Sequence, residues 1–321
     1  MQHSLYALKS GLARYLCMPA VSFGGILMLH RVDYPNPQGI RCNQHLKMSP
    51  ESFEDLVKYA RSKRCSFVSM DEIHDIIVRK KRAKNVIAIT LDDGYKDNFI
   101  NGFPCFKSLN VPFCIYVCTK MVEGTLFSWW DYLENLVLQN EKLVLHDGQE
   151  FACTTNEEKN NAFMKIRERI LQLPQNDLEN EVHQLLPSYE INSEASCGLT
   201  WDDIRLLSKE SLATIGNHTY SHIAMKACDV ATVTEDIMKA QQQMLSKVGI
   251  QMKHFAFPFG GKNAITARDI QLVKELGFRT SATTQYSVLR YGHNCLELPR
   301  IFVTESSYKD AIDNIVNSCK I

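Results

Sequence analysis

Apolar and polar positions along the chain follow two alternating patterns. Short runs of β-branched and other apolar residues predict strands, and longer segments with apolar residues at helical spacing predict helices. The predicted strands are Ile26–Leu29, Ser66–Ser69, Val86–Thr90, Phe113–Val117, Ala213–Gly216, Phe255–Phe257, Thr280–Thr283 and Leu296–Phe302. The predicted helices are Pro50–Ser62, Met70–Val78, Asn98–Leu109, Asp202–Leu207, Val230–Val248, Ala264–Leu276 and Ser307–Asn317. This alternation is typical of a parallel sheet with crossover helices, and the number of strands is consistent with a barrel.

One segment, from Asn140 to Cys197, interrupts this alternation. It is polar and rich in charge, with helical patterns over Glu157–Leu173 and Asp177–Leu186. We interpret it as a helical insertion that either forms a wall over a site or is a solvated excursion without chemistry. The sequence shows no internal repeat or flexible linker, so residues 1–321 are predicted to form a single domain with an insertion at about 140–197.

Charge and cysteine content limit the partners and the compartment. The 36 basic and 36 acidic residues give a net charge of zero, which argues against a nucleic-acid partner. The 11 cysteines are an odd number without a CxxC pair, as expected of free thiols in a reducing compartment. A cytoplasmic location follows as a prediction, and a lipid-linked substrate would place the protein at the inner membrane face.

The N-terminal segment superficially resembles a signal peptide. Lys9 and Arg14 precede an apolar stretch, but no small-residue cleavage site follows it. Leucines at positions 5, 8, 12 and 16 have helical spacing. We interpret the segment as a helix packed on the domain, with a weak membrane-surface helix as the alternative.

Two short segments carry the candidate chemistry. Asp92 and Asp93, in Thr90-Leu91-Asp92-Asp93-Gly94, follow one predicted strand, and His218 and His222 follow another. Asp-Asp-Gly alone would fit a turn, and a lone histidine pair would fit a core, but both segments are expected at the same rim of a parallel sheet. The histidines would share a face if their segment is a helical turn. Three candidate ligands and a spare carboxylate fit metal-assisted hydrolysis.

These two segments resemble the first two motifs of the polysaccharide deacetylase family, which is carbohydrate esterase family 4 with the NodB homology domain. Leu27–Val32 is similar to that family's "YHRV" segment, Phe255–Gly260 to its "AYPYG" loop, and Leu298–Ile301 to a late "PRI" segment. The resemblance implies a distorted (β/α) barrel. It also implies a divalent metal held by Asp93, His218 and His222; zinc is expected, and cobalt, nickel, iron or manganese are alternatives.

The resemblance implies further roles around that metal. Asp92 would be the general base toward the attacking water, and a backbone N–H near Phe259 would stabilise the oxyanion. In permuted relatives, which include poly-N-acetylglucosamine deacetylases, the acid that protonates the leaving amine is on the N-terminal strand. His30 has that position here; its alternative is a histidine that closes a core strand.

Three further interpretations concern side chains around this core. Arg300 could hold Asp92 by charge-assisted hydrogen bonds or form an unrelated ion pair. Trp129, Trp130 and Tyr220 could offer faces to a sugar ring, although large aromatic residues are more often core. The arginine that the family carries in its third motif is absent, since Lys253 and His254 precede that loop, so Arg300 would have to orient Asp92.

The predicted function is metal-dependent removal of an N-acetyl group from an N-acetylated sugar in a polysaccharide or its precursor. The alternatives are hydrolysis of another amide or of an O-acetyl ester, and a non-catalytic carbohydrate-binding relative. The partner is therefore expected to be an N-acetylated glycan or glycan precursor.

Overall fold

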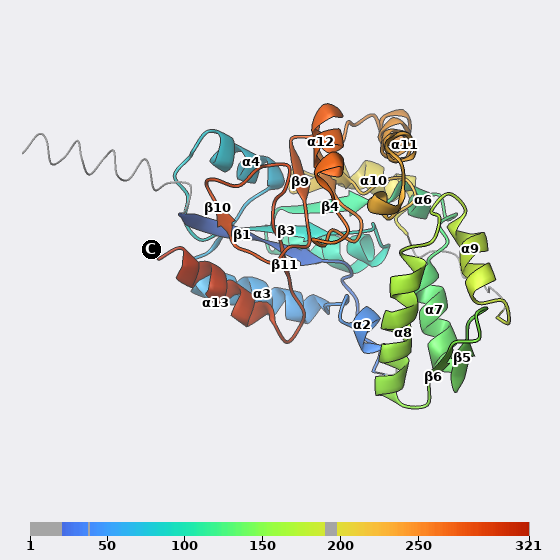
Figure 1. The fold of residues 1–321 in the computed structure, drawn as a ribbon. Helices are drawn as coiled ribbons and strands as arrows, with labels where there is room; N and C mark the ends of the chain where they lie inside the picture. Colours follow the sequence, from blue (N-terminus) through green and yellow to red (C-terminus); the bar gives the residue numbers. More distant parts are fainter. Residues whose placement is uncertain (1–20, 38, 190–197, 321) are drawn as a thin grey trace, which may run out of the picture.

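A curled, mostly parallel sheet forms the centre of the molecule (Figure 1), seen in a computed structural model that describes residues 21–37, 39–189 and 198–320. Its order is β10-β1-β3-β4-β7-β8-β9, with β11 paired to β1 and β2 paired to β3. The strands are β1 (Ser22–Leu29), β2 (Ser66–Phe67), β3 (Val86–Leu91), β4 (Phe113–Val117), β7 (Ala213–Asn217), β8 (His254–Ala256), β9 (Thr280–Ala282), β10 (Leu289–Arg290) and β11 (Ile301–Phe302). The proposed N-terminal helix lies outside the described residues.

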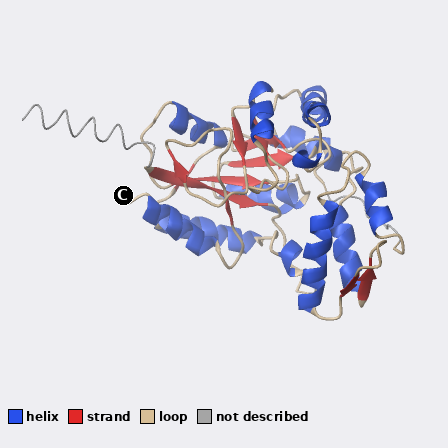
Figure 2. Ribbon diagram, viewed as in Figure 1, coloured by secondary structure: helices blue, strands red, loops and turns tan. Residues whose placement is uncertain are grey.

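The two faces of the sheet are covered by different apolar clusters. Every residue of β1, β3 and β4 is buried, as expected for central parallel strands covered on both faces. Leu27 and Ile89 contribute to a cluster with helices on the outer face, whereas Ile26, Ala88 and Tyr116 contribute to a cluster inside the curl. The helices therefore form layers against the strands of this sheet (Figure 2).

Three helices have the bounds that the apolar pattern predicts, and each has a capping residue at its start. The helices α3 (Pro50–Ser62), α4 (Met70–Val78) and α11 (Val230–Val248) have the predicted bounds. Each begins after a side chain that caps its first turn, from Ser49, Ser69 and Asp229 respectively. Three other helices start and end within three residues of their predicted bounds: α10 (Trp201–Leu207), α12 (Ala267–Glu275) and α13 (Tyr308–Ser318).

Two predicted elements are less regular than expected. The predicted helix Asn98–Leu109 is a π-helical turn, η2 (Asn98–Gly102), followed by the short helix α5 (Phe103–Ser108). The predicted strand Leu296–Phe302 is regular only over β11. Pro299 has no N–H for a sheet ladder, which accounts for the interruption.

The irregular segment before β11 brings the two ends of the curled sheet together. Leu298 forms a parallel bridge to Ala282 of β9, and Ile301 pairs with Leu27 of β1. The barrel is thus completed by one short, kinked segment instead of a full strand. This architecture confirms the predicted α/β fold of the distorted (β/α) barrel type.

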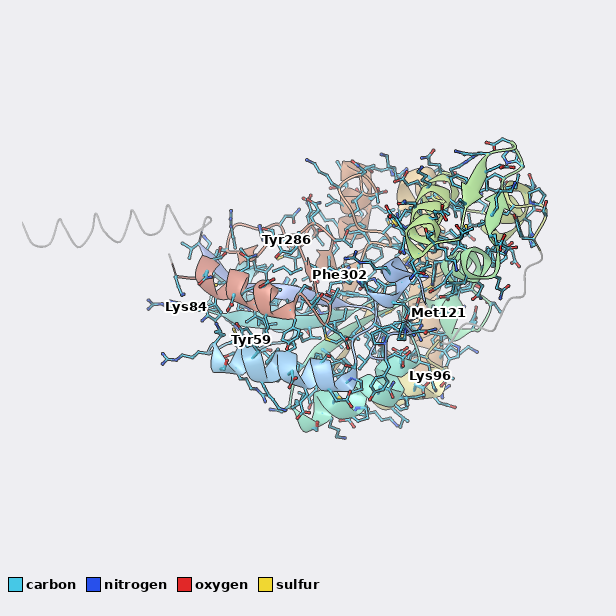
Figure 3. The ribbon with its side chains drawn as sticks, turned by 90° about the horizontal axis from the view of Figure 1, so that it is seen from below. Tyr59, Lys84, Lys96, Met121, Tyr286 and Phe302 are labelled. Carbon is cyan, nitrogen blue, oxygen red and sulfur yellow. The ribbon has the colours of Figure 1, made fainter. Side chains whose placement is uncertain are left out.

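The outer helices α3 and α13 lie side by side (Figure 3), and Tyr59 lies between them. The Tyr59 hydroxyl donates a 2.9 Å hydrogen bond to Asp313 of α13. Other short helices are α2 (Arg41–Gln44), α6 (Thr119–Val122) and the 3₁₀ turn η3 (Met225–Ala227). None of the helices in the described ranges has the length and apolar character needed to cross a bilayer.

A separate group of elements extends from one end of the sheet (Figure 1). It consists of α7 (Trp129–Gln139), a hairpin of β5 (Lys142–Val144) and β6 (Glu150–Ala152), α8 (Asn156–Ile170) and α9 (Leu178–Leu185). Helices α8 and α9 match the two predicted helical patterns, but α7 and the hairpin were not predicted. Phe151, Phe163 and Leu133 belong to an apolar cluster that also includes Tyr95 and Cys118, so the group packs onto the barrel through a shared core.

Candidate active site

The strand register brings three polar side chains to one rim. Leu29 of β1 pairs with Leu91 of β3, so His30 and Asp92 leave the sheet together, and the Asp92 N–H donates to the Leu29 carbonyl at 3.2 Å. Asp93 and Gly94 then turn the chain sharply with φ of 72° and 90°. Asp93 itself adopts the left-handed conformation, and Gly94, which tolerates that conformation without strain, continues the turn.

The loop that carries His218 and His222 is not the helical turn that we expected. Thr219 and His222 have φ of 65° and 56°, and the segment between β7 and η3 has no helical residues. Asp236 of α11 accepts hydrogen bonds from the N–H groups of Tyr220 (2.7 Å) and Ser221 (3.1 Å). The helical prediction was wrong because a carboxylate from a distant helix fixes this loop in left-handed conformations.

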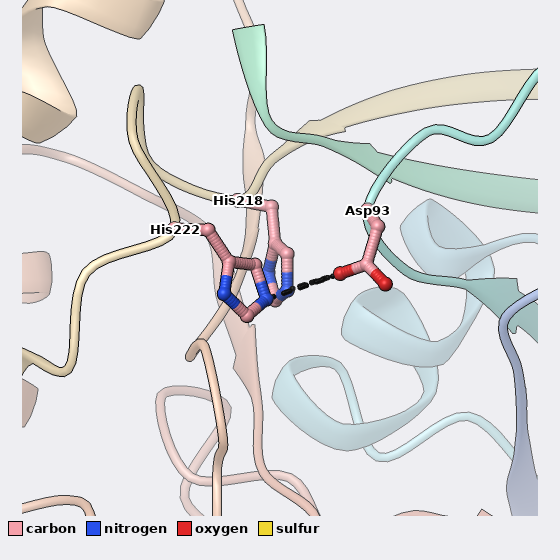
Figure 4. Close-up of side chains that lie close together, drawn as sticks. All are labelled: Asp93, His218 and His222. Carbon is pink, nitrogen blue, oxygen red and sulfur yellow. Dashed lines mark ion pairs between the residues drawn. The ribbon is translucent and has the colours of Figure 1, made fainter. Parts of the chain in front are cut away.

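Asp93, His218 and His222 converge on one point (Figure 4). Asp93 Oδ1 lies 3.4 Å from His218 Nε2 and 3.1 Å from His222 Nε2. All three side chains are buried, and their candidate ligand atoms lie within 4.8 Å of one another. They form the one such group of three or more metal-binding side chains found among the described residues.

The chemistry of these three side chains fits a divalent cation. His218 Nδ1 lies 2.8 Å from the Ala256 carbonyl oxygen, so a neutral His218 donates from Nδ1 and presents the lone pair of Nε2. Two imidazole nitrogens and a carboxylate oxygen then face one another. Without a cation, His218 and His222 can instead carry protons on Nε2; burial alone would raise the pKa of Asp93, but hydrogen bonds from these protonated rings hold that pKa well below its usual value. A cation or shared protons must offset this concentration of acceptors, and the N, N, O set is typical of zinc.

Arg300 fixes Asp92 beside these ligands. Its guanidinium donates to both carboxylate oxygens of Asp92, at 2.6 and 2.7 Å, and to the Thr283 carbonyl at 2.9 Å. Arg300 is fully buried and Asp92 is 3 % exposed. Burial opposes ionisation of Asp92, but the charge of Arg300 prevails and lowers the pKa of that carboxyl. Of the two interpretations of Arg300, the structure therefore has the one in which it holds Asp92 by charge-assisted hydrogen bonds.

His30 lies in the same cleft as Asp92 and the three candidate ligands. Its ring contacts Phe302 edge to face at a centroid distance of 5.9 Å, and its Nδ1 is buried without a hydrogen-bond partner in the described part of the chain. Burial lowers the pKa of His30, although the charges of Asp93 and Asp92 oppose the shift. The imidazole is therefore neutral at rest near pH 7.

Aromatic side chains surround the ligands in a cleft of about 370 Å³. The Trp130 ring lies 5.1 Å from the His222 ring, and its indole N–H donates to the Tyr95 hydroxyl at 3.0 Å. Phe259 contacts His222 edge to face at 4.7 Å, with its backbone in the left-handed region at φ 59°. Trp129 lies behind Phe259 at 6.2 Å. These contacts pack the His222 ring against aromatic side chains.

Tyr220 does not line this cleft, contrary to our expectation. Its hydroxyl donates to Glu123 at 3.0 Å, and Lys239 covers its ring at 3.6 Å, in a separate hollow on the other side of the histidine loop. Its neighbour Ser221 is turned by the hydrogen bond to Asp236, which carries the Tyr220 side chain away from the ligands.

The cleft contains residues that the sequence did not suggest. Tyr95 follows Gly94 directly, so its proximity to the first motif was an available signal. Phe163, Met164 and Arg167 come from α8 of the insertion. The insertion therefore forms a wall of the cleft, which was one of the two interpretations left open, and no local pattern distinguished it from a solvated excursion.

Comparisons by sequence and by structure both find deacetylases among known proteins. A family model described as polysaccharide deacetylase matches residues 79–281. The deacetylase PplD from Streptococcus pyogenes, solved with acetate, has a TM-score of 0.62 at 14% identity, over 94% of this chain and 100% of that one. IcaB from Ammonifex degensii has a TM-score of 0.60 at 17% identity, over 92% and 97%. A de-N-acetylase from Aggregatibacter actinomycetemcomitans has a TM-score of 0.58 at 14% identity, over 91% and 99%. No curated protein sequence matches the chain.

Proposed function

We propose that this chain, which belongs to the polysaccharide deacetylase family, is a metal-dependent hydrolase that removes an N-acetyl group from a sugar in a glycan or glycan precursor. Membership of the family identifies the chain as a deacetylase-type hydrolase of carbon–nitrogen bonds other than peptide bonds. The observation that carries the metal-dependent mechanism is the convergence of Asp93, His218 and His222 beside the Asp92–Arg300 pair.

In the proposed mechanism, Asp93, His218 and His222 hold the cation. A bound cation would supply a Lewis acid that polarises the acetamide carbonyl and lowers the pKa of water to roughly 7. Asp92 accepts a proton from the attacking water, and Arg300 keeps this carboxylate ionised and fixed in direction. The backbone near Phe259 is our candidate donor to the developing oxyanion.

The leaving amine requires a proton, and His30 is the donor that we propose. Since the imidazole is neutral at rest, the proton that it gives to the amine must reach it during the reaction, and the proton that Asp92 takes from the attacking water is the source. The position of His30 at the end of β1, beside Asp92, agrees with the permuted placement that the sequence suggested. The proposal predicts that His30 matters only when the leaving group is a poor one.

Zinc is the metal that we propose, with cobalt, nickel, iron or manganese as alternatives, because an N, N, O set leaves open positions for water and substrate. Trp130 and Phe259 form the apolar side of the cleft, which suits the face of a sugar ring. We further propose a single domain over residues 1–321 and a cytoplasmic location, at the inner membrane face if the substrate is lipid-linked.

The central test is acetate release from N-acetylglucosamine oligomers by the metal-free protein, before and after zinc is added. We expect release to require the metal and to fall by about 10² to 10⁴-fold in Asp92→Asn, which removes the proton acceptor. Metal-independent release, or full activity in Asp92→Asn, would contradict the mechanism. Binding of the oligomer without turnover in the zinc-loaded protein would instead support the non-catalytic alternative.

A second test distinguishes the proposed general acid, His30, from the proposed general base, Asp92. An aryl acetate ester has a leaving group that departs without protonation, whereas an acetamide does not. His30→Gln should therefore lose acetamide hydrolysis and retain ester hydrolysis, while Asp92→Asn should lose both. Equal losses on the two substrates in His30→Gln would show that His30 does not act as the acid.

A further inference from the structure

We infer that the substrate of this site is an anionic glycan, whose phosphate or carboxylate group binds in a second hollow beside the metal cleft. This inference rests on the proposed function, because it names the substrate class of the same site. The hollow has a volume of about 870 Å³ and shares Arg167 and Phe259 with the cleft. We call it the basic groove; its walls are α8 with the turn that follows it, and the loops at 224–227 and 259–264.

One continuous face of α8 lines both hollows. Phe163, Met164 and Arg167 face the cleft, and Arg167, Glu168, Leu171 and Gln172 face the basic groove. Residues separated by four positions share a helix face, so these side chains form one stripe. From Phe163 to Gln172 the stripe extends roughly 14 Å at the usual helical rise. A surface of that length accommodates more than a single sugar ring, so a chain seated at the metal ligands continues along α8 into the basic groove.

The charges in the basic groove favour an anion. Among the described residues that line it, Lys226 and Lys262 bring positive charge from two loops and Arg167 adds a guanidinium from α8, whereas Glu168 is the one carboxylate. The chain as a whole has equal numbers of acidic and basic residues, so this excess is local. Lys226 is fixed by a 3.1 Å hydrogen bond from Nζ to the Asn263 carbonyl, which leaves its other N–H groups for a ligand.

The Arg167 guanidinium marks the boundary between the two hollows. It lies 5.8 Å from the centroid of the Phe259 ring, and that ring contacts the metal ligand His222. An anion held by Arg167 and the two lysines would thus be adjacent to the sugar whose acetamide lies at the metal ligands. Lysine and arginine bind phosphate and carboxylate by the same charge-assisted hydrogen bonds, so the chemistry defines an anion of either kind.

The other large hollow near the histidine loop is not suited to bind the anionic group of the substrate. It is lined by four acidic residues, Asp177, Glu179, Glu235 and Asp236, and by only two lysines. It shares no lining residue with the metal cleft. A substrate that extends from the cleft therefore meets positive charge in the basic groove.

The test compares matched neutral and anionic substrates in the zinc-loaded protein. A hyaluronan tetrasaccharide and an N-acetylglucosamine tetramer form the carboxylate pair, and N-acetylglucosamine 1-phosphate and N-acetylglucosamine form the phosphate pair. We expect the anionic member of at least one pair to have the higher kcat/KM, mainly through KM. Each of Lys226→Gln and Lys262→Gln should reduce that preference about fivefold, by lowering kcat/KM more for the anionic member than for the neutral one.

Lys274→Gln is the matched control, because Lys274 is an exposed lysine of α12 that lines neither hollow. It should leave the preference unchanged. Equal kcat/KM for both members of both pairs, or a preference that persists in the Lys226→Gln/Lys262→Gln double variant, would overturn the inference. Hydrolysis of none of the substrates would refute the proposed function instead.

Direct binding measurements distinguish a failure of the basic-groove inference from a failure of the proposed hydrolase function. Calorimetry of N-acetylglucosamine 1-phosphate and of the hyaluronan tetrasaccharide should show tighter binding than their neutral counterparts, and this advantage should disappear in the double variant. That result would support the basic groove even without turnover. Binding of the anionic and neutral members with equal affinity would overturn it even if the neutral oligomer is hydrolysed.

Discussion

The two sides of the metal cleft are built in different ways. On the barrel rim, Asp92, Asp93 and His218 are buried at the ends of parallel strands, and each side chain has a partner that fixes its direction. On the insertion wall, Met164 is 42% exposed and Arg167 is half-buried. The rim side chains are therefore fixed in direction, whereas the wall presents more exposed side chains that can adapt to a ligand.

Two acidic residues, one on each side, show the difference in electrostatic terms. Asp92 on the rim is paired with Arg300, and its pKa is lowered. Asp131 on α7 of the wall makes no hydrogen bond or ion pair through its side chain within the described residues. Burial raises its pKa to about 6, although Arg31 opposes the shift. Removing the charge should therefore have opposite effects on stability at the two positions.

The largest expected effect concerns the rim. Asp93→Asn removes the charged ligand, and we expect loss of stoichiometric zinc and a fall in kcat/KM of at least about 10³-fold, because a bound cation supplies several kcal/mol of transition-state stabilisation. Elemental analysis and acetate release measure the two effects. Met164→Ala is the counterpart on the wall and should raise KM with little change in kcat; a comparable loss of kcat there would break the contrast.

The next largest effect is on stability. Arg300→Met leaves the buried carboxylate of Asp92 without its partner and should lower the free energy of unfolding by about 3 to 5 kcal/mol, as measured by urea denaturation. The Asp92→Asn/Arg300→Met double variant removes both charges and should recover part of that stability while remaining inactive. Additive losses in the double variant would show that the pair does not interact energetically.

Asp131→Asn should have the opposite sign. A pKa raised from 3.8 to about 6 means that folding favours the neutral carboxyl, so this stabilisation is complete below pH 3.8 and is lost as the pH rises through about 6. At pH 7 the asparagine variant should therefore be more stable than the parent by about 1 to 2 kcal/mol, a figure reduced for the partial exposure of this side chain. The difference should shrink as the pH falls toward 4, as followed by urea denaturation at each pH.

Glu134→Gln is the control for Asp131, one turn further along the same helix. Glu134 accepts hydrogen bonds from the Ile40 N–H at 3.0 Å and from the Asn43 amide at 2.7 Å. Its replacement should destabilise the protein by about 1 kcal/mol. If Asp131→Asn also destabilised the protein, the wall acid would have a partner and the contrast with the rim would fail.

The sequence predicted the rim far better than the wall, for a physical reason. Strands such as Phe113–Val117 and helices such as α3 depend on the local spacing of apolar residues and on capping residues. Both features can be recognised within a short stretch of sequence. The ends of parallel strands share one rim, so the order of residues along the chain was enough to place Asp92, Asp93 and the histidines together. The family resemblance then supplied their roles, which stay proposals.

The features that were missed depend on contacts between distant segments. The left-handed histidine loop is imposed by Asp236 of α11, and the wall depends on how α7 and α8 pack on each other. Helix α7 begins at Trp129 and packs against α8, and a contact between two helices of this kind is not visible in a local pattern. The direction of Tyr220 follows from the distant contact with Asp236, so no local pattern could have excluded it from the cleft.

The smallest expected effect is at Tyr220, and it sharpens the boundary of the site. Tyr220→Phe removes one hydrogen bond to Glu123 outside the cleft and should cost about 0.5 to 1 kcal/mol of stability, with kcat/KM changed by less than about twofold. Trp130→Phe should reduce kcat/KM more strongly, because the indole contacts His222 and donates to Tyr95 inside the cleft. A larger loss in Tyr220→Phe than in Trp130→Phe would place the substrate on the other side of the histidine loop, beside the acidic hollow, and would exclude the route along α8.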